Sequence, residues 1–203
     1  MAGLIQYQGV GPVAGCDEAG RGCLAGPVYA AAVILPEGYS HPEIRDSKLL
    51  SALRRERLAG EIIRDALAFA VASVEPEEID RINILNASIR AMHLALDNLE
   101  IVPGLIIVDG NRFNPYRNIP HRCIIRGDNH YLEIAAASIL AKTARDAYMK
   151  GLHSNHPEYG WISNKGYPSA KHIEALRAFG ITVHHRKSFR VNGQLSLTFE
   201  SST

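Results

Sequence analysis

The segment Ala14-Gly-Cys-Asp-Glu-Ala-Gly-Arg-Gly22 places two adjacent acids at the end of an apolar run, followed by an arginine between glycines. Neighbouring side chains of a strand point to opposite faces, and the Asp17 and Glu18 carboxylates repel each other. Such a pair is therefore most useful where divalent cations neutralise it. Glycines also let backbone amides approach a substrate, since they carry no Cβ. The alternative interpretation is a polar turn, because glycine-rich turns with Asp and Glu are common.

Length and composition describe an ordinary globular protein. The 203 residues suit one domain, or one domain with an appendage, and can bury a full core. A hydrophobic content of 46% and a net charge of +1 exclude a disordered chain or a bulk polycation. The N-terminus lacks a signal-peptide pattern, and no apolar run is long enough for a membrane span, so we expect a cytoplasmic protein. Cys16, Cys23 and Cys123 fit no zinc spacing and predict reduced thiols.

Apolar periodicity predicts a mixed α/β sheet covered by helices. Strands are expected at residues 13–16, 28–35, 68–74, 105–108 and 123–125. Helices are expected at residues 51–66, at 76–99 as two helices, at 131–150 and at 169–178, where Gly180 follows.

Two further acids follow the later strands of this sheet. Asp109 stands where the strand 105–108 ends, and Asp128 follows the next short strand. Active groups collect at strand ends in such sheets, although Asp128 alone would equally suit a helix cap. With Asp17 and Glu18, these side chains offer oxygen ligands that favour Mg²⁺ or Mn²⁺ over zinc. Two such ions, about 3.5 to 4 Å apart, would activate a water and stabilise the leaving oxygen of a phosphodiester.

Basic and aromatic residues from separate segments accompany the acids. For any single lysine a solvated surface position is the default interpretation. Between Gly160 and Val191, however, cations greatly outnumber acids, and a local basic face suits a phosphate backbone. The candidate residues are Arg21, Lys48, Lys142, Lys165, Arg186 and Lys187, with Tyr167 in Asn164-Lys-Gly-Tyr-Pro168.

Eight segments stand in order along nearly the whole chain. They are Gly15-Cys-Asp-Glu-Ala-Gly-Arg-Gly22, Asp46-Ser-Lys-Leu49, Ile82-Asn-Ile-Leu85, Val108-Asp-Gly-Asn111, Gly127-Asp128, Ala135-Ala-Ala-Ser-Ile-Leu-Ala-Lys142, Lys165-Gly-Tyr167 and His185-Arg-Lys-Ser-Phe189. With these segments the sequence resembles the ribonuclease HII family, the type 2 ribonucleases H. One departure is Cys23, which stands where the family usually has proline.

The resemblance implies a ribonuclease H-like fold, a mixed five-stranded sheet flanked by helices with a helical C-terminal extension, over residues 1–190. It implies hydrolysis of the RNA strand of RNA/DNA hybrids and incision 5′ of ribonucleotides embedded in duplex DNA, leaving 3′-hydroxyl and 5′-phosphate. The implied ligands of two divalent ions, Mn²⁺ or Mg²⁺, are Asp17, Glu18, Asp109 and Asp128.

The resemblance also implies substrate contacts. Gly20, Arg21 and Gly22 match the family's loop at the ribose 2′-hydroxyl, the group that separates RNA from DNA. Tyr167 matches the residue that stacks on the sugar at the RNA-to-DNA junction. Further substrate-binding residues carried over from the matching segments are Lys48, Lys142 and Arg186.

Two alternatives stay open at this point. Another two-metal nuclease of the same fold superfamily, a type 1 ribonuclease H or a junction resolvase, would share the acids but not the Gly-Arg-Gly loop and Tyr167. A non-catalytic nucleic-acid-binding protein could lose the acids, all of which are present here.

The tail, residues 191–203, contains Gln194-Leu-Ser-Leu-Thr-Phe199. Gln194, Leu195, Leu197 and Phe199 resemble the short peptide by which bacterial repair enzymes dock on the sliding clamp, which binds as an extended segment. The alternative is a segment that packs on the body of the protein, since six-residue matches arise easily. We expect a monomer with no membrane contact.

Overall fold

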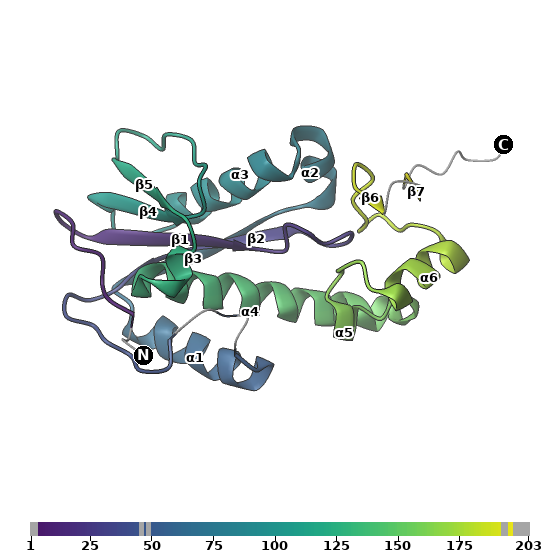
Figure 1. Ribbon diagram of the computed structural model, residues 1–203, viewed down its shortest axis with the longest axis horizontal. Helices are drawn as coiled ribbons and strands as arrows, with labels where there is room; N and C mark the ends of the chain where they lie inside the picture. The colour runs from purple at the N-terminus through teal and green to yellow at the C-terminus, as the bar shows by residue number, and fades with distance from the viewer. Residues whose placement is uncertain (1–3, 45–46, 48–49, 192–194, 197–203) are drawn as a thin grey trace.

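The computed structural model describes residues 4–44, 47, 50–191 and 195–196. A five-stranded sheet in the order β3-β2-β1-β4-β5 lies at its centre (Figure 1). The strands are β1 (Val13–Ala19), β2 (Val28–Ile34), β3 (Ala68–Val74), β4 (Leu105–Asp109) and β5 (His121–Ile124).

Strand directions explain where the acids lie. β1 pairs antiparallel with β2, and β2 with β3, whereas β1, β4 and β5 run parallel to one another. The register places Cys16 opposite Val108. The residues that follow on the two strands, Asp17 and Asp109, therefore arrive at the same edge of the sheet.

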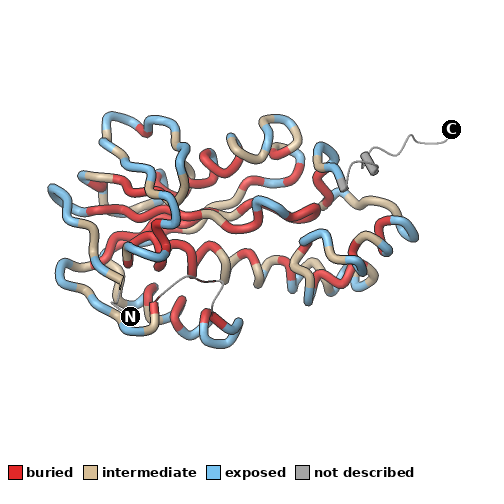
Figure 2. The backbone as a smooth tube through the Cα atoms, viewed as in Figure 1, coloured by how far each residue is buried: buried red, intermediate tan, exposed pale blue. Residues whose placement is uncertain are grey.

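Helices cover both faces of the sheet (Figure 1). α1 (Ala52–Asp65) and α4 (Leu132–Asn155) lie on one face, and α2 (Pro76–Ile82) and α3 (Ile84–Asp97) on the other. The buried parts of the chain follow the strands and the helix sides that face them (Figure 2). Fully buried Leu58 and Ile62 anchor α1, and each such side chain contributes about 1.5 to 3 kcal/mol.

α4 packs closely against β1 because small residues line the contact. Ala135, Ala136 and Ala137 are all buried on the helix. A Cβ placed on Gly15 of β1 would overlap the backbone of Glu133, so only glycine fits there. The helix contains 24 residues and is about 36 Å long, which carries it past the edge of the sheet.

A C-terminal helical lobe packs on the far end of α4 (Figure 1). It consists of η3 (Pro157–Tyr159), α5 (Trp161–Asn164) and α6 (Ala170–Phe179). Its small core joins Tyr159 and Trp161 to Met149 of α4 and to Leu24, which follows β1. The lobe is therefore tied to the loop after β1. The short strands β6 (Arg190–Val191) and β7 (Leu195–Ser196) pair antiparallel beyond it.

The structure confirms the predicted fold class, although several element boundaries differ from the predicted ones. β1 continues to Ala19, because Asp17 and Glu18 still pair with β2. β5 begins at His121, two residues before its predicted start. α4 ends at Asn155 instead of Lys150. Cys16, Cys23 and Cys123 are free thiols. Within the described ranges, no helix is long and apolar enough to cross a membrane.

Candidate active site

Three acidic side chains line one pocket at the ends of β1 and β4. Asp17 and Glu18 lie near the end of β1, and Asp109 is the last residue of β4. Asp17 is buried, at 5% exposure, and the Glu18 side chain is 13% exposed. The Asp17 carboxylate accepts a hydrogen bond from the Glu18 backbone N–H at 2.7 Å. Parallel pairing of the two strands thus gathers three carboxyl groups that lie 92 positions apart at most in the sequence.

These carboxyl groups lie close enough that the negative charge of one makes ionisation of the others less favourable. Burial raises the pKa of Asp17 well above its usual range, and the nearby Glu18 and Asp109 carboxylates raise it further. Hydrogen bonds from the Ser138 hydroxyl and the Glu18 N–H act in the opposite direction without cancelling this effect. A divalent cation would relieve both the burial cost and the repulsion. The oxygen-only donors fit Mg²⁺ or Mn²⁺.

Asp128 lies in the turn next to these acids. It belongs to η2 (Gly127–Asn129), is buried, and accepts a hydrogen bond from the Asn129 side chain at 3.1 Å. The Asp109 carboxylate accepts from the Gly127 N–H at 2.7 Å, which fixes the turn to the end of β4. Asp128 does not line the pocket, and in the described part of the chain no three acidic, histidine or cysteine side chains form a ready-made metal site. Its role as the fourth ligand stays a prediction.

The loop after β1 forms another wall of the pocket. Gly20, Arg21 and Gly22 all line it. Gly20 has a φ of +95°, and a Cβ there would overlap the Arg145 guanidinium, so both conformation and space require glycine. The exposed Arg21 donates to Glu18 at 3.2 Å, which leaves its guanidinium at the mouth of the pocket.

Two buried arginines support this loop from below. Arg145 donates to the carbonyls of Ala25, Pro27 and Lys165, and Arg186 to those of Gly26 and Arg21. Main-chain carbonyls therefore accept the hydrogen bonds of both cations, although the buried Nη2 of Arg186 has no hydrogen-bond partner among the residues that the structure describes. No carboxylate pairs with either arginine among the described ion pairs.

Arg186 lies away from the surface that a substrate would touch. It is fully buried, does not line the pocket, and holds the Arg21 carbonyl at 3.0 Å. Burial lowers its pKa to about 10, which still leaves it charged at neutral pH. Its predicted contact with substrate stays a prediction, and what the geometry provides is support for the loop. Lys48, the other basic residue expected from its motif, lies outside the described residues.

Tyr167 and Lys142 complete the pocket opposite the acids. Both line it, and the Lys142 ammonium lies 5.9 Å from the centre of the Tyr167 ring. Tyr167 is 42% exposed, so part of its side chain is accessible to a ligand. The Lys142 Nζ also donates to Asp146 at 2.6 Å, and Asp146 in turn accepts from Arg55 at 2.8 Å. This network fixes the position of the lysine.

The sequence analysis missed several residues of the pocket and its support. Ser47 and Ser138 both line it, with their hydroxyls 3.0 Å apart. Ser138, Lys142 and Asp146 recur every four residues along α4, which places them on one face of the helix. That spacing could have identified Ser138 and Asp146 once Lys142 was selected. Nothing local to the sequence indicates the buried position of Arg145.

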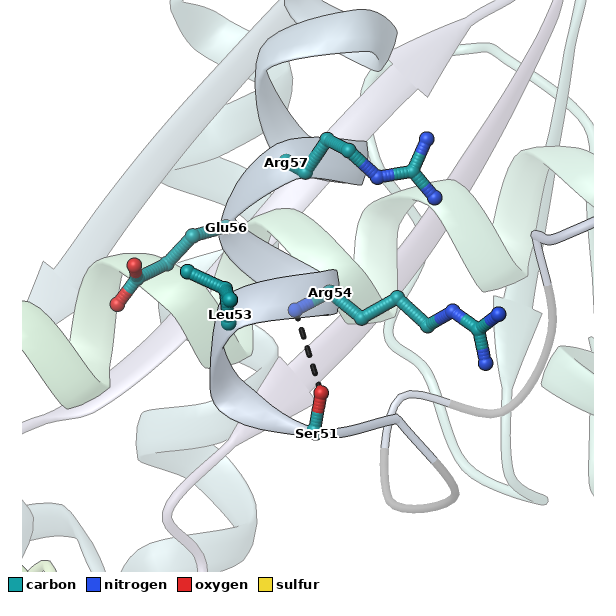
Figure 3. A pocket seen from close by; sticks show the side chains of 5 residues that line it. All are labelled: Ser51, Leu53, Arg54, Glu56 and Arg57. Carbon is teal, nitrogen blue, oxygen red and sulfur yellow. Dashed lines mark hydrogen bonds between the residues drawn. The ribbon is translucent and has the colours of Figure 1, made fainter.

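A second cavity lies on the surface of α1 (Figure 3). Ser51 caps this helix by accepting from the Arg54 N–H at 3.3 Å. The Arg54 and Arg57 side chains point to one side of the helix and both pair with Glu43. Leu53 is largely exposed. Asp17, Glu18 and Asp109 do not line this cavity. The pocket at the ends of β1 and β4, which they do line, is therefore the candidate active site.

A sequence model described as Ribonuclease HII matches residues 14–192, a range that contains every acid and loop discussed above. The chain belongs to the ribonuclease HII family. A ribonuclease HII of Parabacteroides distasonis is 54% identical over 198 residues, which cover 97% of this chain and 100% of the relative. The family membership makes the protein an endoribonuclease that acts on RNA/DNA hybrids, as the resemblance of its motifs predicted.

Solved structures agree with this assignment. The ribonuclease H2 of Pyrococcus horikoshii OT3 has a TM-score of 0.73 and 28% identity, and the match covers 88% of this chain and 93% of that one. A chain in the PCNA:RNase HII complex from Archaeoglobus fulgidus has a TM-score of 0.73 and 26% identity, over 91% and 98% of the two chains. The ribonuclease HII fold is therefore shared beyond its close relatives.

Proposed function

We propose that this ribonuclease HII incises duplex DNA on the 5′ side of an embedded ribonucleotide, as well as RNA in RNA/DNA hybrids, and leaves 3′-hydroxyl and 5′-phosphate ends. The observation that carries the proposal is that one pocket joins three kinds of group. They are the carboxylates of Asp17, Glu18 and Asp109, the loop Gly20–Gly22, and the partly exposed side chain of Tyr167.

The carboxylates would hold the divalent cations, with Asp128 contributing from the adjacent turn. When bound, such ions supply an activated water and stabilise the leaving oxygen of the phosphodiester. The protein's own part is to hold the ligands in place, which the parallel strands and the Asp109-to-Gly127 hydrogen bond do. The raised pKa of Asp17 supports this role, because the site is built to contain positive charge.

The loop and the tyrosine would select the cut. Gly20 and Gly22 present backbone to the substrate without a Cβ, which allows direct contact with a ribose 2′-hydroxyl. Arg21 is exposed beside the pocket and can exchange its weak ion pair with Glu18 for a phosphate. Tyr167 offers its ring face to a sugar on the other side of the pocket. An all-DNA duplex would lack the group that the loop recognises.

The decisive experiment is cleavage of an end-labelled DNA duplex that contains one ribonucleotide, with Mg²⁺ or Mn²⁺. We expect a single product that ends 5′ of the ribonucleotide, and no cut in an all-DNA duplex of the same sequence. Asp17→Asn is the matched control for contaminating nuclease, because it removes a charge but little volume. Cleavage of the RNA/DNA hybrid without incision at the single ribonucleotide would refute the proposed selectivity while leaving the family activity intact.

We also propose that the tail docks on a sliding clamp through Gln194, Leu195, Leu197 and Phe199. Only Leu195 lies within the described residues, where its backbone pairs with Val191. The structural neighbour from Archaeoglobus fulgidus, a complex of an RNase HII with PCNA, supports the proposal. Deletion of residues 194–203 is expected to abolish clamp binding in a titration and to leave oligonucleotide cleavage unchanged. A loss of thermal stability without any clamp binding by the intact chain would favour packing of the tail on the body.

A further inference from the structure

Two buried histidines form a hydrogen-bonded chain inside the C-terminal lobe. His172 of α6 and His185 lie with their Nε2 atoms 3.2 Å apart, and both are at most 1% exposed. The Trp161 Nε1 lies 3.2 Å from the same His172 Nε2. At the other end of each ring, His172 Nδ1 is 2.9 Å from the Tyr167 carbonyl, and His185 Nδ1 is 2.9 Å from the Thr182 N–H.

The partners determine where each proton lies. A carbonyl oxygen only accepts, so His172 carries its proton on Nδ1 and donates to Tyr167. Its Nε2 is then an acceptor, which suits the indole N–H of Trp161. The Thr182 N–H only donates, so His185 accepts on Nδ1 and carries its proton on Nε2, from which it donates to His172. Both rings are neutral, and the Trp161 and His185 N–H groups share the single lone pair of His172 Nε2 in a bifurcated hydrogen bond.

This chain ends on the segment that presents Tyr167 to the pocket. Three successive carbonyls of that segment are held: Lys165 by Arg145 at 2.8 Å, Gly166 by the Leu24 N–H at 2.7 Å, and Tyr167 by His172. The Ser169 N–H donates to the Tyr167 carbonyl as well. Gly166 has a φ of +83°, which glycine adopts without strain, and a Cβ there would overlap the Ala25 carbonyl.

We infer that His172 is a positioning residue: through its Nδ1 proton it holds the Tyr167 backbone so that the ring faces the sugar at the cut site. The inference rests on the proposed role of Tyr167 in incision at a ribonucleotide. His185 acts one step further away, since its Nε2 proton keeps His172 in the tautomer that donates to Tyr167.

Two substitutions distinguish a positioning role of His172 from a role in which its side chain only fills space in the core. Asn places a side-chain amide near the position of Nδ1, so His172→Asn retains a donor for the Tyr167 carbonyl. Gln reaches the position of Nε2, so His172→Gln retains a partner for Trp161 and loses that donor. Each variant removes about half of the ring's bonds, and a purely structural role predicts similar behaviour for both.

The assay is single-turnover incision of a duplex with one ribonucleotide, beside cleavage of a long RNA/DNA hybrid and a Mn²⁺ titration. We expect His172→Gln to lose about tenfold in incision rate, the equivalent of one hydrogen bond, and His172→Asn to stay within about threefold of wild type. The Mn²⁺ midpoint is expected to be unchanged in both. Equal losses in the two variants, or equal losses on both substrates, would overturn the inference.

A double-mutant cycle with Tyr167→Ala tests the route of the effect. If His172 acts through Tyr167, His172→Gln adds less than about twofold to the loss caused by Tyr167→Ala alone. Multiplicative losses would show that His172 acts elsewhere. A wild-type protein that cleaves hybrid but does not incise at the single ribonucleotide would instead remove the proposed function, which makes the two failures distinguishable.

A measurement on the wild-type protein tests the tautomers directly and uses a variant only to assign the signal. Nitrogen-15 NMR of histidine-labelled protein at pH 7, with His172 assigned by its absence in His172→Asn, reports which ring nitrogen carries the proton. We expect protonation of His172 on Nδ1 and of His185 on Nε2. A His172 ring protonated on Nε2 alone would lack the Nδ1 proton and could not support Tyr167 as inferred.

Discussion

Acid is expected to destabilise the fold through His185. Burial, together with the neighbouring His172, His184 and His156 rings, lowers the pKa of His185 from 6.5 to about 3. In the unfolded chain the His185 ring is protonated below about pH 6.5, whereas in the folded chain it stays neutral down to about pH 3. The free energy of unfolding therefore falls as the pH drops from 6.5 towards 3. At 1.36 kcal/mol per pKa unit, the complete effect is roughly 5 kcal/mol. Between pH 7 and pH 5 it amounts to about 2 kcal/mol.

The assay compares wild type with His185→Asn, whose side-chain oxygen can still accept from the Thr182 N–H. Trp161, the single tryptophan of the chain, lies 5.4 Å from the His185 ring and reports urea unfolding by fluorescence. The variant is expected to be less stable at pH 7, because it loses the bond to His172. This deficit is expected to shrink by about 2 kcal/mol at pH 5, since the variant no longer carries the group that titrates.

The difference in unfolding free energy between wild type and His185→Asn removes the contributions of titrating groups that behave alike in both proteins. Burial raises the pKa of Glu75 and Glu133, so their protonation favours the fold as the pH falls, but equally in both proteins. The lowered pKa of His172 acts in the same direction as that of His185. A difference in unfolding free energy that stays constant from pH 7 to pH 5 would refute the neutral, buried histidine pair.

Three further predictions concern the pocket. Asp17→Asn and Asp109→Asn should each abolish cleavage. Asp17→Asn should also raise the melting temperature, because the raised pKa of Asp17 means that its charge is unfavourable in the fold. A lower melting temperature of this variant would contradict the second expectation. Tyr167→Ala should slow incision at a single ribonucleotide, through lost stacking of about 1 to 3 kcal/mol, without changing Mn²⁺ affinity. Gly20→Ala should destabilise the protein by about 1 to 3 kcal/mol in urea unfolding, since its φ is positive and Arg145 occupies the space; an unchanged midpoint would show that the loop can move.

Local patterns in the sequence were sufficient for the sheet and for three of the acids. Continuous apolar runs identify buried strands, and an acid that directly follows such a run lies near a strand end: Asp17 lies two residues before the end of β1, and Asp109 is the last residue of β4. Asp17 and Asp109 were predicted on this basis, and the parallel register of β1 and β4 places them side by side. Boundaries were less accurate where pairing extends a strand past its apolar residues, as it does at Glu18.

The position of Arg186 shows what local patterns cannot provide. Its sequence neighbours are charged and polar, which favours a surface position, yet the side chain is fully buried. Its partner, the Gly26 carbonyl, is 160 residues away in the sequence. Only the packing of the C-terminal lobe against the loop after β1 creates that environment. The same holds for Arg145, whose role depends on carbonyls from two distant segments.

The charges of the two buried arginines are relevant to the binding of a nucleic-acid backbone at the pocket. Three carboxylates at one end favour divalent cations, and Arg145 and Arg186 place two positive charges beneath the loop at the other end. Carbonyls, not carboxylates, accept their hydrogen bonds, so their charge is oriented but not neutralised within the described ion pairs. In a low-dielectric interior such charge would act on a phosphate bound at the loop without being exposed to solvent. Burial of Arg186 is thus compatible with an electrostatic contribution to substrate binding that involves no direct contact.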